Sequence, residues 1–404
     1  MLGQSTTSAN KISAQQERKL LIICPTDTWG GVEKNVRLRA AAMAQRGHSV
    51  TVLLCENTFE ARFKDLPNVH LETMPYRPSN LSPSLYWSFY RKIKKIQPDC
   101  VFVPLKKDWW AATLAGYLAK VPQRILYLGI KRRIKENLKY RLLFKSLKAL
   151  LIVNSKDLRT HLKSSNRYLH DGNLKLIYNG FELPELGAAL GGLRSSLGIP
   201  LDAPVVGCAG RFSHQKGFDL LPEILHQLPE NAHLIIAGGG DLEDQLCRQF
   251  NDTVGSERIH LIGPQNDMSM FFQTLDIFLL PSRNEGMANV LNEALSYGLP
   301  AVSTHVPGSA ELLEADPDTP DDLLDSPGIW RGKHGLITRV NDTEALARAL
   351  NLLISGKVKF DPEQQRGKIR RDHDLTIMMN LTEQIFFNQT FDEKPTTPRQ
   401  KAAS

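Results

Sequence analysis

Residues 276–298 read DIFLLPSRNEGMANVLNEALSYG, and this stretch decides how the second half of the chain is interpreted. Its apolar run ends at Pro281 and predicts a short strand that is buried on both faces. Glu285 falls in the loop that follows. We expect a helix to begin near Ala288 or Asn289, which places Glu293 inside that helix. This order of strand, loop and helix is the repeating unit of an α/β protein.

The same alternation runs through the rest of the chain. The first half contains the apolar runs KLLIICP (19–25), HSVTVLLC (48–55), PDCVFVPL (98–105), QRILYLGI (123–130), ALLIVNS (149–155) and LKLIYNG (174–180). The second half contains PVVGCAG (204–210), AHLIIAGGG (232–240), RIHLIG (258–263), DIFLLPS (276–282), LPAVSTH (299–305) and HGLIT (334–338). Helical patterns lie between these runs, so the sequence predicts two Rossmann-like, doubly wound α/β domains.

The chain has 404 residues, which is too long for one ordinary hydrophobic core. A Gly-, Pro- and Leu-rich stretch over residues 180–202 suits a linker between domains. We therefore divide the chain as follows: 1–18 a disordered lead, 19–188 an N-terminal domain, 189–375 a C-terminal domain, 376–390 a helix packing back toward the N-terminal domain, and 391–404 a disordered tail. The acidic, Pro-rich residues 314–330 read as a surface insertion.

Composition indicates a soluble cytoplasmic protein. Apolar residues make up 42% and charged residues 23%, and neither a transmembrane run nor a signal peptide is apparent. Five cysteines are scattered without a metal or redox spacing. Three of them sit in apolar runs, which favours a reducing compartment.

The net charge of +7 hides an asymmetry between the two halves. Residues 1–200 contain 32 Lys and Arg against 14 Asp and Glu, and residues 91–148 contain 16 against 3. Such a field favours an anionic partner, although an ordinary solvated basic face explains part of it. YRKIKKI and KRRIKENLKYRLLFKSLKALL mix cations with Leu, Phe and Tyr, as an interfacial helix would.

The ends of the predicted strands carry the residues that chemistry needs. Ligands of open parallel sheets bind at the carboxyl ends of the strands. After PVVGCAG come Arg211 and Lys216, and glycines follow the next two strands. Glycines with cations at successive strand ends form a pocket for phosphate and nucleotide groups, while the paired carboxylates Glu285 and Glu293 suit sugar and ribose hydroxyls.

Taken singly, each of these features has an ordinary explanation. A lone GGG is more often a tight turn than a nucleotide site, and two glutamates eight positions apart occur by chance in long chains. His214 is interpreted as incidental. The ordered set of Arg-x4-Lys, Gly-rich turn and Glu-x7-Glu carries the prediction.

With these motifs the chain resembles the retaining GT-B glycosyltransferases of family 4, the group 1 glycosyl transferases that include enzymes of lipopolysaccharide and exopolysaccharide synthesis. The resemblance spans nearly all of residues 19–390. It rests on GRFSHQKGFDLL, LIIAGGGDLEDQL and the stretch quoted above in the second half, and on GGVEKNVRLRAAAMAQRGHSVTVL in the first. It implies two domains that face each other across a cleft, with residues 19–188 binding the acceptor and residues 189–375 binding the nucleotide sugar.

The resemblance also implies residue roles. Arg211 and Lys216 would neutralise the donor diphosphate and, with Glu285 beside the donor sugar, form the catalytic set, while Glu293 would hold the ribose hydroxyls. The residues expected to bind the donor are Gly30, Gly31, Gly210, Gly239, Gly263, Gly286, Met287, Ala288, Asn289 and Glu293. Retention of anomeric configuration and catalysis without a metal or other cofactor are implied as well.

One departure from the family pattern concerns the acceptor side. Many members carry a histidine at or just after the strand that here reads QRILYLGI, whereas this chain continues with KRRIKEN. Lys106, Lys107, Asp108 and Arg132 are candidate acceptor contacts, and none is assigned as a catalytic base. The expected acceptor is a membrane-associated, anionic glycolipid or polysaccharide such as lipopolysaccharide core. We expect the protein to lie on the inner face of the cytoplasmic membrane through residues 91–148.

Alternatives stay open. UDP is the expected nucleotide, ahead of GDP and ADP. A metal-dependent GT-A enzyme would use a DxD motif, but Asp316-Pro-Asp318 lies in the acidic insertion. A Rossmann oxidoreductase lacks its GxGxxG fingerprint here. A nucleotide-sugar epimerase, a phosphorylase and a basic nucleic-acid- or anion-binding Rossmann protein are the remaining alternatives, and no nucleic-acid-binding motif accompanies the charge.

Overall fold

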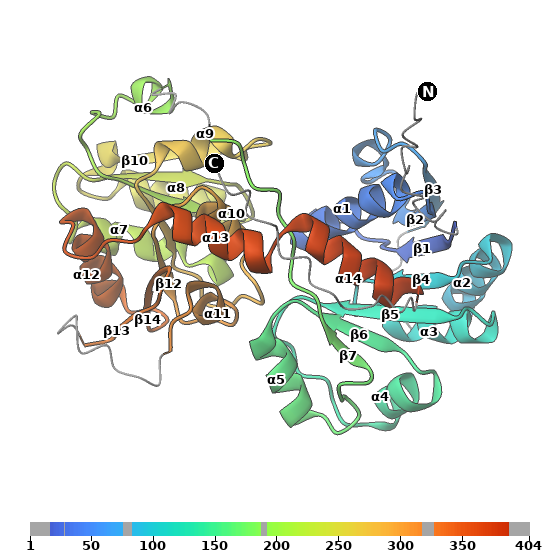
Figure 1. Ribbon diagram of the computed structural model, residues 1–404. Coiled ribbons are helices and arrows are strands. Elements are labelled where there is room, and N and C mark those ends of the chain that lie inside the picture. The colour runs from blue at the N-terminus through green and yellow to red at the C-terminus, as the bar shows by residue number, and fades with distance from the viewer. Residues whose placement is uncertain (1–16, 28, 76–82, 187–191, 317–326, 388–404) are drawn as a thin grey trace, which may run out of the picture. The chain divides into compact units, whose positions relative to one another are not determined.

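The computed structural model describes residues 17–27, 29–75, 83–186, 192–316 and 327–387 (Figure 1). The predicted lead and tail, most of the acidic insertion and Asp318 lie outside the described residues. The chain divides into two compact units. The first runs to Tyr127 and also takes Lys145–Leu150 and the chain from Thr382; the second takes Leu128–Phe144 and Leu151–Leu381.

The first sheet has seven strands in the order β3-β2-β1-β4-β5-β6-β7. The strands are β1 (Lys19–Ile23), β2 (Ser49–Cys55), β3 (Val69–Met74), β4 (Cys100–Val103), β5 (Gln123–Leu128), β6 (Leu150–Val153) and β7 (Leu174–Leu176). The pairings of β1 with β2 and β4, of β2 with β3, of β4 with β5 and of β6 with β7 are all parallel. Leu20 of β1 lies opposite both Val50 of β2 and Cys100 of β4. The reversal of direction beside β1 is the doubly wound arrangement that the sequence predicts.

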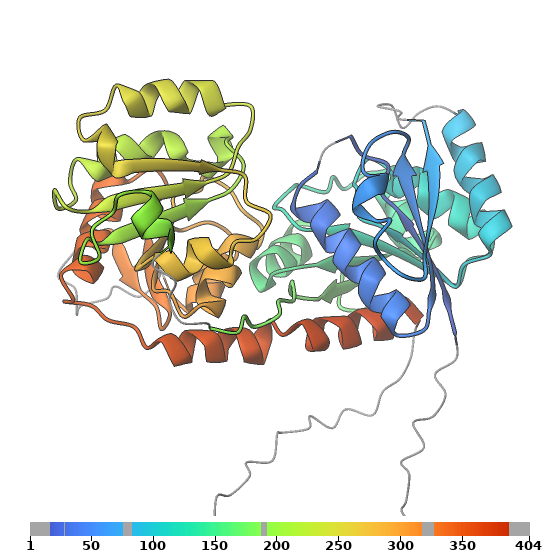
Figure 2. The same ribbon diagram turned by 90° about the horizontal axis from the view of Figure 1, so that it is seen from above.

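Helices cover the first sheet on both faces. They are α1 (Gly31–Gln45), α2 (Pro83–Ile96), α3 (Trp109–Leu118), α4 (Leu138–Arg141) and α5 (Lys156–Ser165), with a π turn at Leu142–Ser146 and a 3₁₀ turn at Glu60–Arg62. Figure 2 shows α1, in dark blue, and α2, in cyan, on opposite sides of the blue strands. β1 and β4 are buried almost along their whole length, which is why their sequences are apolar runs rather than alternating ones.

The second sheet repeats the topology in the order β10-β9-β8-β11-β12-β14-β13. Its strands are β8 (Val205–Ala209), β9 (His233–Ala237), β10 (Ile259–Gly263), β11 (Ile277–Leu280), β12 (Ala301–Thr304), β13 (Ile329–Arg331) and β14 (Gly335–Thr338). All neighbours are parallel except β13 and β14, which are antiparallel. The prediction of two Rossmann-like domains is confirmed.

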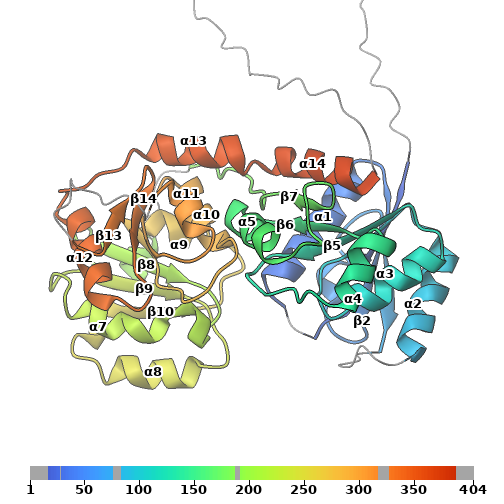
Figure 3. The same ribbon diagram turned by 90° about the horizontal axis from the view of Figure 1, so that it is seen from below.

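The second sheet lies between two layers of helices (Figure 3). The helices of this half are α6 (Gly192–Ser196), α7 (Leu221–Leu225), α8 (Glu243–Asn251), α9 (Ser269–Thr274), α10 (Asn289–Ser296), α11 (Ser309–Leu313), α12 (Thr343–Ile354) and α13 (Pro362–Asp372), with 3₁₀ turns at His214–Lys216, Phe218–Leu220 and Ser256–Arg258. One core joins α7, α8 and α12 to the sheet, and the other joins α9, α10 and α11 to its opposite face.

The last helix, α14 (Leu375–Phe387), ends in the first unit. Glu383 accepts hydrogen bonds from Arg46 at 2.7 Å and lies 2.8 Å from Nε2 of His48. Phe386 packs on Phe102 of β4, with ring centroids 5.1 Å apart. The end of α14 is thus part of the hydrophobic core beside α1 and β4.

Three sequence expectations need correction. Strands β3 and β13 were not predicted: β3 is short of apolar residues, and β13 falls in the stretch assigned to the acidic insertion. Of the two segments expected to resemble an interfacial helix, YRKIKKI (90–96) lies in α2, whereas the second is not one helix. Residues 131–136 are irregular, and the helical part begins only at Leu138. The helix expected around FDLLPEILHQL is confined to α7, preceded by a 3₁₀ turn.

Candidate functional site at the carboxyl ends of the second sheet

The loop after β8 carries the two predicted cations. Arg211 is exposed and makes no ion pair among the described residues, while the next residue, Phe212, is buried and anchors the loop. The backbone N–H of Phe212 donates to the carbonyl of Gly239, in the loop after β9. The 3₁₀ turn that follows brings Lys216 back toward Gly210. The loop therefore presents one free cation and one held cation at the edge of the sheet where ligands of such folds bind.

The held cation, Lys216, pairs with Glu285. Its Nζ lies 2.6 Å from Oε1 of Glu285, and Oγ of Ser282 donates to the same oxygen at 2.8 Å. Only 19% of the Lys216 side chain and 9% of the Glu285 side chain are exposed, so water screens this pair weakly. The ends of β8 and β11 thus meet at one charged, hydrogen-bonded cluster, made of two residues that the sequence predicts and one, Ser282, that it missed.

Arg283 ties the loops after β8 and β11 together. Its guanidinium makes two parallel hydrogen bonds of 2.7 Å to the carboxylate of Asp219, the bidentate geometry typical of strong Arg–carboxylate pairs. It also donates to the carbonyl of His214 at 2.7 Å. Hydrogen bonding by Arg283 lowers the pKa of Asp219. Asp219 and Arg283 are 64 positions apart, so no local motif could have found this pair.

The glycines after β9 serve packing before ligand binding. A Cβ at Gly238 would overlap the carbonyl oxygen of Gly210, because the two strand ends approach each other closely. Gly239 lies beside Glu243 and Pro264, and a Cβ on Gly263 would meet nothing within 4 Å. Gly238 is therefore explained by close packing of the two strand ends. At Gly263 the backbone has open space beside it, and the approach of a ligand there stays a prediction.

Glu293 lies on α10, as predicted from the sequence. The helix begins at Asn289 after the buried residues Glu285–Ala288, and Ala288 offers no side chain to cap it. Burial raises the pKa of Tyr297, and so do the negative charges of Asp267 and Glu293. Glu293 is the fifth residue of this helix, which follows the loop at the carboxyl end of β11. The predicted ribose-binding carboxylate thus stands at the carboxyl edge of the sheet.

The glycines of the first unit open α1. Gly30 is the N-cap of that helix, and its N–H donates to the carboxylate of Glu33 at 2.9 Å. Trp29 precedes Gly30, and the guanidinium carbon of Arg62 lies 4.6 Å from the centroid of the Trp29 ring. The loop before Gly31 is therefore anchored by an aromatic contact and a carboxylate cap. Its approach to a donor diphosphate stays a prediction.

The candidate acceptor contacts divide by exposure. Lys107 donates from Nζ to the carbonyl of Pro25 at 2.7 Å, whereas Arg132 is exposed. Asp108 is 3% exposed. Burial raises its pKa to about 7, against the opposing charge of Lys107.

The basic stretch is only partly solvated. Lys92 and Lys95 of α2 both bind Glu72, at 2.7 and 3.2 Å. The guanidinium of Arg124 donates to the backbone carbonyls of Val121 and Leu147. Because these cations have partners within the protein, they contribute less than their full charge to the electrostatic potential of the surface. The exposed cations that remain are Arg91, Lys94, Lys120, Lys131, Arg132, Arg133, Lys135, Lys139, Arg141, Lys145 and Lys148.

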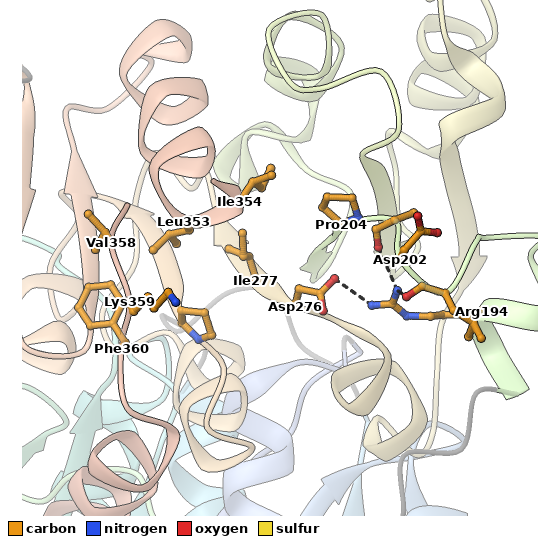
Figure 4. Close-up of a pocket in the computed structure, with 13 residues that line it drawn as sticks. Arg194, Asp202, Pro204, Asp276, Ile277, Leu353, Ile354, Val358, Lys359 and Phe360 are labelled. Carbon is orange, nitrogen blue, oxygen red and sulfur yellow. Dashed lines mark hydrogen bonds and ion pairs between the residues drawn. The ribbon is translucent and has the colours of Figure 1, made fainter. Parts of the chain in front are cut away.

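A separate pocket of about 390 Å³ lies at the opposite edge of the second sheet. Three of its lining residues, Pro204, Asp276 and Pro300, immediately precede β8, β11 and β12, so it lies at the amino ends of these strands. Figure 4 shows Arg194 joined to Asp276 in this pocket, at 2.8 Å. Arg194 also donates to the carbonyls of Thr274 and Ala203, which leaves it no donor for a phosphate. This pocket is therefore not the predicted donor site.

Within the described ranges, no group of three or more metal-binding side chains forms a candidate metal centre. The same residues contain no helix that is long and apolar enough to cross a bilayer.

Two family models match the chain. Glycosyltransferase Family 4 matches residues 29–184, and Glycosyl transferases group 1 matches residues 203–356. Together the two models cover most of the chain, one for each sheet. The chain belongs to the family 4 (group 1) glycosyltransferases.

Individual relatives agree with this assignment. The lipopolysaccharide core biosynthesis glycosyltransferase LpsE of Rhizobium meliloti is 32% identical over 162 residues, which are 40% of this chain and 43% of that protein. The chain thus matches less than half the length of that relative. An Escherichia coli UDP-Gal:alpha-D-GlcNAc-diphosphoundecaprenol alpha-1,3-galactosyltransferase is 25% identical over 325 residues, 76% of this chain and 79% of that protein.

A solved structure shows the same fold. Anabaena Alr3699/HepE, crystallised in complex with UDP, superposes with a TM-score of 0.74 at 19% identity, covering 92% of this chain and 100% of that one. The fold of the chain is therefore GT-B, built of two Rossmann-like domains.

Proposed function

We propose that the protein transfers a hexosyl or related sugar from a nucleoside-diphosphate sugar, with UDP as the nucleotide, to a glycolipid or polysaccharide acceptor. The observation that carries the proposal is the cluster of Lys216, Glu285 and Ser282 where β8 and β11 end. Family membership supports glycosyl transfer as the reaction class. The UDP in the Anabaena structure and the UDP-Gal in the name of the Escherichia coli relative support the nucleotide.

The cations at the strand ends supply the chemistry of donor cleavage. Negative charge grows on the diphosphate as the glycosidic bond breaks, and a nearby cation in a site of low water content stabilises that charge. Arg211 is free for this role. Lys216 becomes available when the diphosphate competes with Glu285 for its ammonium group.

Glu285 and Glu293 would then bind different parts of the donor. Glu285, held by Ser282 as well as by Lys216, keeps its orientation beside the sugar when Lys216 turns to the phosphate. Glu293 accepts from the ribose hydroxyls. We propose that the reaction needs no metal, because the cations Arg211 and Lys216 would take the role that a divalent ion has in other enzymes. We propose as well that the reaction retains anomeric configuration, as the resemblance to retaining members of the family implies.

A thermal-shift screen of UDP-, GDP- and ADP-sugars tests the donor proposal. A ligand that binds only the native state raises the melting temperature by mass action. We expect a UDP-sugar to shift the wild type, with a much smaller shift for Glu293→Ala. Glu223→Ala is the matched control, because Glu223 is an exposed glutamate of α7 away from the strand ends. Absence of a shift with every nucleotide sugar would contradict the proposal.

We further propose that the acceptor is membrane-associated and that the first half docks on an anionic bilayer. The outer face of α2 supports this: Trp87 is 61% exposed and stacks on Tyr90, and Arg91 and Lys94 follow it at helical spacing. An exposed tryptophan beside cations suits the headgroup region of a membrane. The names of the lipopolysaccharide-core and undecaprenol-linked relatives support a lipid-linked acceptor. We therefore propose that the protein lies peripherally on the inner face of the cytoplasmic membrane.

Sedimentation with vesicles of phosphatidylglycerol and phosphatidylcholine tests the docking proposal. The wild type is expected to sediment at low salt and to be released at 1 M salt, where the Debye length falls to about 3 Å. A variant with Trp87→Ser and Arg91→Ser should stay in the supernatant. The control variant Lys357→Ser, which removes an exposed lysine of the second half, should sediment like the wild type. Equal sedimentation of all three proteins would overturn this part of the proposal.

A further inference from the structure

Asp108 occupies the carboxyl edge of the first sheet. It follows β4 and directly precedes α3, and β4 is hydrogen-bonded to β1. Burial raises the pKa of the Cys24 thiol, which lies just past the end of β1. The charges of Glu33 and Asp108 raise this pKa further, and the charge of Lys107 lowers it. The carboxyl edge of a parallel sheet is where open α/β domains bind their ligands. Asp108 is thus one of three charged groups gathered where β1 and β4 end.

The surroundings of Asp108 do not satisfy it. It is 3% exposed, and its Oδ2 has no hydrogen-bond partner among the described residues. Buried carboxyl groups are normally paired or hydrogen-bonded, because an unpaired one loses its hydration without compensation. An acidic residue held in this state is costly, and an ordinary packing position would be filled by an apolar residue.

The usual structural roles do not account for it. Asp108 sits at the N-cap of α3, but its side chain makes no capping hydrogen bond. The neighbouring ammonium group of Lys107 donates to the carbonyl of Pro25, and no ion pair joins it to Asp108 in the described part of the chain. Glu33 is engaged at the start of α1, where it accepts from Gly30. None of these neighbours therefore donates a hydrogen bond to Oδ2 of Asp108.

We propose that the carboxyl group of Asp108 accepts a hydrogen bond from a hydroxyl group of the acceptor hexose. The inference rests on the proposed transfer function and adds the acceptor side to it. A carboxylate accepts well from a sugar hydroxyl, and a hydrogen bond to a charged group is stronger than one between neutral groups. This bond would orient the acceptor. Asp108 would thus supply a polar contact on the acceptor side, although the family's histidine after QRILYLGI is missing from this chain.

Three proteins test this: the wild type, Asp108→Asn and Thr113→Val. Thr113 of α3 is the matched control, because it is fully buried and its hydroxyl is also unpartnered. Binding of octyl β-D-glucoside and octyl β-D-galactoside, each below its micelle-forming concentration, is followed by saturation-transfer NMR with UDP present. We expect the wild type and Thr113→Val to bind one of the hexosides equally, and Asp108→Asn to bind it about tenfold more weakly.

Stability separates this role from a structural one. At pH 8 without ligand, Asp108→Asn should melt at a higher temperature than the wild type, because it removes an unpaired buried charge. Lys107, whose charge acts on Asp108, remains in both proteins. If Asp108 stabilised the fold, Asp108→Asn would instead melt at a lower temperature than the wild type.

The outcomes are distinct. Equal hexoside binding by the wild type and Asp108→Asn, binding of neither hexoside by the wild type, or a lower melting temperature of Asp108→Asn would each overturn the inference. A UDP-sugar should raise the melting temperature of all three proteins alike. Failure of the UDP-sugar to stabilise the wild type would instead refute the proposed donor, so the two failures are told apart.

Discussion

Arg39 shows what a single buried residue costs this protein. Its side chain is fully buried in α1, and none of its guanidinium nitrogens has a hydrogen-bond partner within the described residues. Its only compensation there is the faces of Phe102 and Tyr127, with ring centroids 5.8 and 5.5 Å from the guanidinium carbon. Burial lowers the pKa of Arg39 to about 10, which leaves it charged at neutral pH. Cation–π contacts offset only part of the lost hydration.

We therefore predict that Arg39→Met stabilises the protein. An unbranched apolar side chain of similar length fills the same space without a buried charge, and such replacements raise stability by about 1–4 kcal/mol. Urea denaturation measures the free energy of unfolding. Arg62→Met, which removes an arginine from the surface stack on Trp29, should not stabilise. A loss of stability in Arg39→Met would mean that the guanidinium has a partner outside the described residues.

At the scale of elements, the loop between β8 and α7 depends on one glycine. Gly217 has φ of 71°, and a Cβ there would overlap the carbonyl oxygen of Pro281, which follows β11. The close approach holds Lys216 against Glu285. The left-handed conformation alone costs a side chain about 1–2 kcal/mol.

Gly217→Ala and Gly356→Ala form a matched pair that isolates the close approach. Gly356 has a similar φ of 69° but meets only the flexible side chain of Lys359. We expect Gly356→Ala to lose about 1–2 kcal/mol of unfolding free energy. Gly217→Ala should lose clearly more and should also lose the thermal shift with the UDP-sugar. Equal losses in both variants would show that the contact with Pro281 is unimportant.

The sequence predicted most elements, and the exceptions have physical causes. Strands β8, β9 and β11 are buried on both faces along nearly their whole length, so each appears as an apolar run. β3 does not, because only Met74 of its six residues is fully buried. β13 was missed because it is an antiparallel edge strand of three residues.

The candidate site was predicted in part. Local spacing placed Lys216, Glu285 and Glu293 at successive strand ends, and the structure joins the first two. The pair of Asp219 and Arg283 could not be predicted, since contacts between distant strand ends leave no periodic signal. The state of Asp108 was equally hidden, because burial and lost hydrogen bonds are properties of the folded chain.

At the scale of the whole molecule, His373 couples stability to pH. It closes α13, is 2% exposed, and its Nδ1 lies 3.2 Å from the carbonyl oxygen of Asn179. Burial lowers its pKa to about 4, although the hydrogen bond to Asn179 opposes that shift. The unfolded chain binds a proton at pH values near 6.5, whereas the folded protein does not until about pH 4. Between these values, protonation favours the unfolded state.

We therefore predict that His373 contributes a loss of stability as the pH falls from 6.5 to 4. The contribution amounts to about 3 kcal/mol across that window, at 1.36 kcal/mol per pH unit. Urea denaturation at several pH values measures it as the difference between the wild type and His373→Gln, whose acid loss should be smaller. His226→Gln, which removes an exposed histidine, should follow the wild-type curve. Parallel curves for the wild type and His373→Gln would contradict the prediction.

The account as a whole depends on a diphosphate held by side-chain cations in the second half of the chain. Calorimetric titration of UDP into the wild type in the presence of EDTA tests this most directly, with Lys216→Ala and the surface control Lys357→Ala beside it. We predict that UDP binds the wild type and Lys357→Ala equally without divalent ions. Lys216→Ala should bind at least about tenfold more weakly, since one charge-assisted hydrogen bond to phosphate is lost. Failure of UDP to bind the wild type, binding only when a divalent ion is supplied, or undiminished binding to Lys216→Ala would contradict the account.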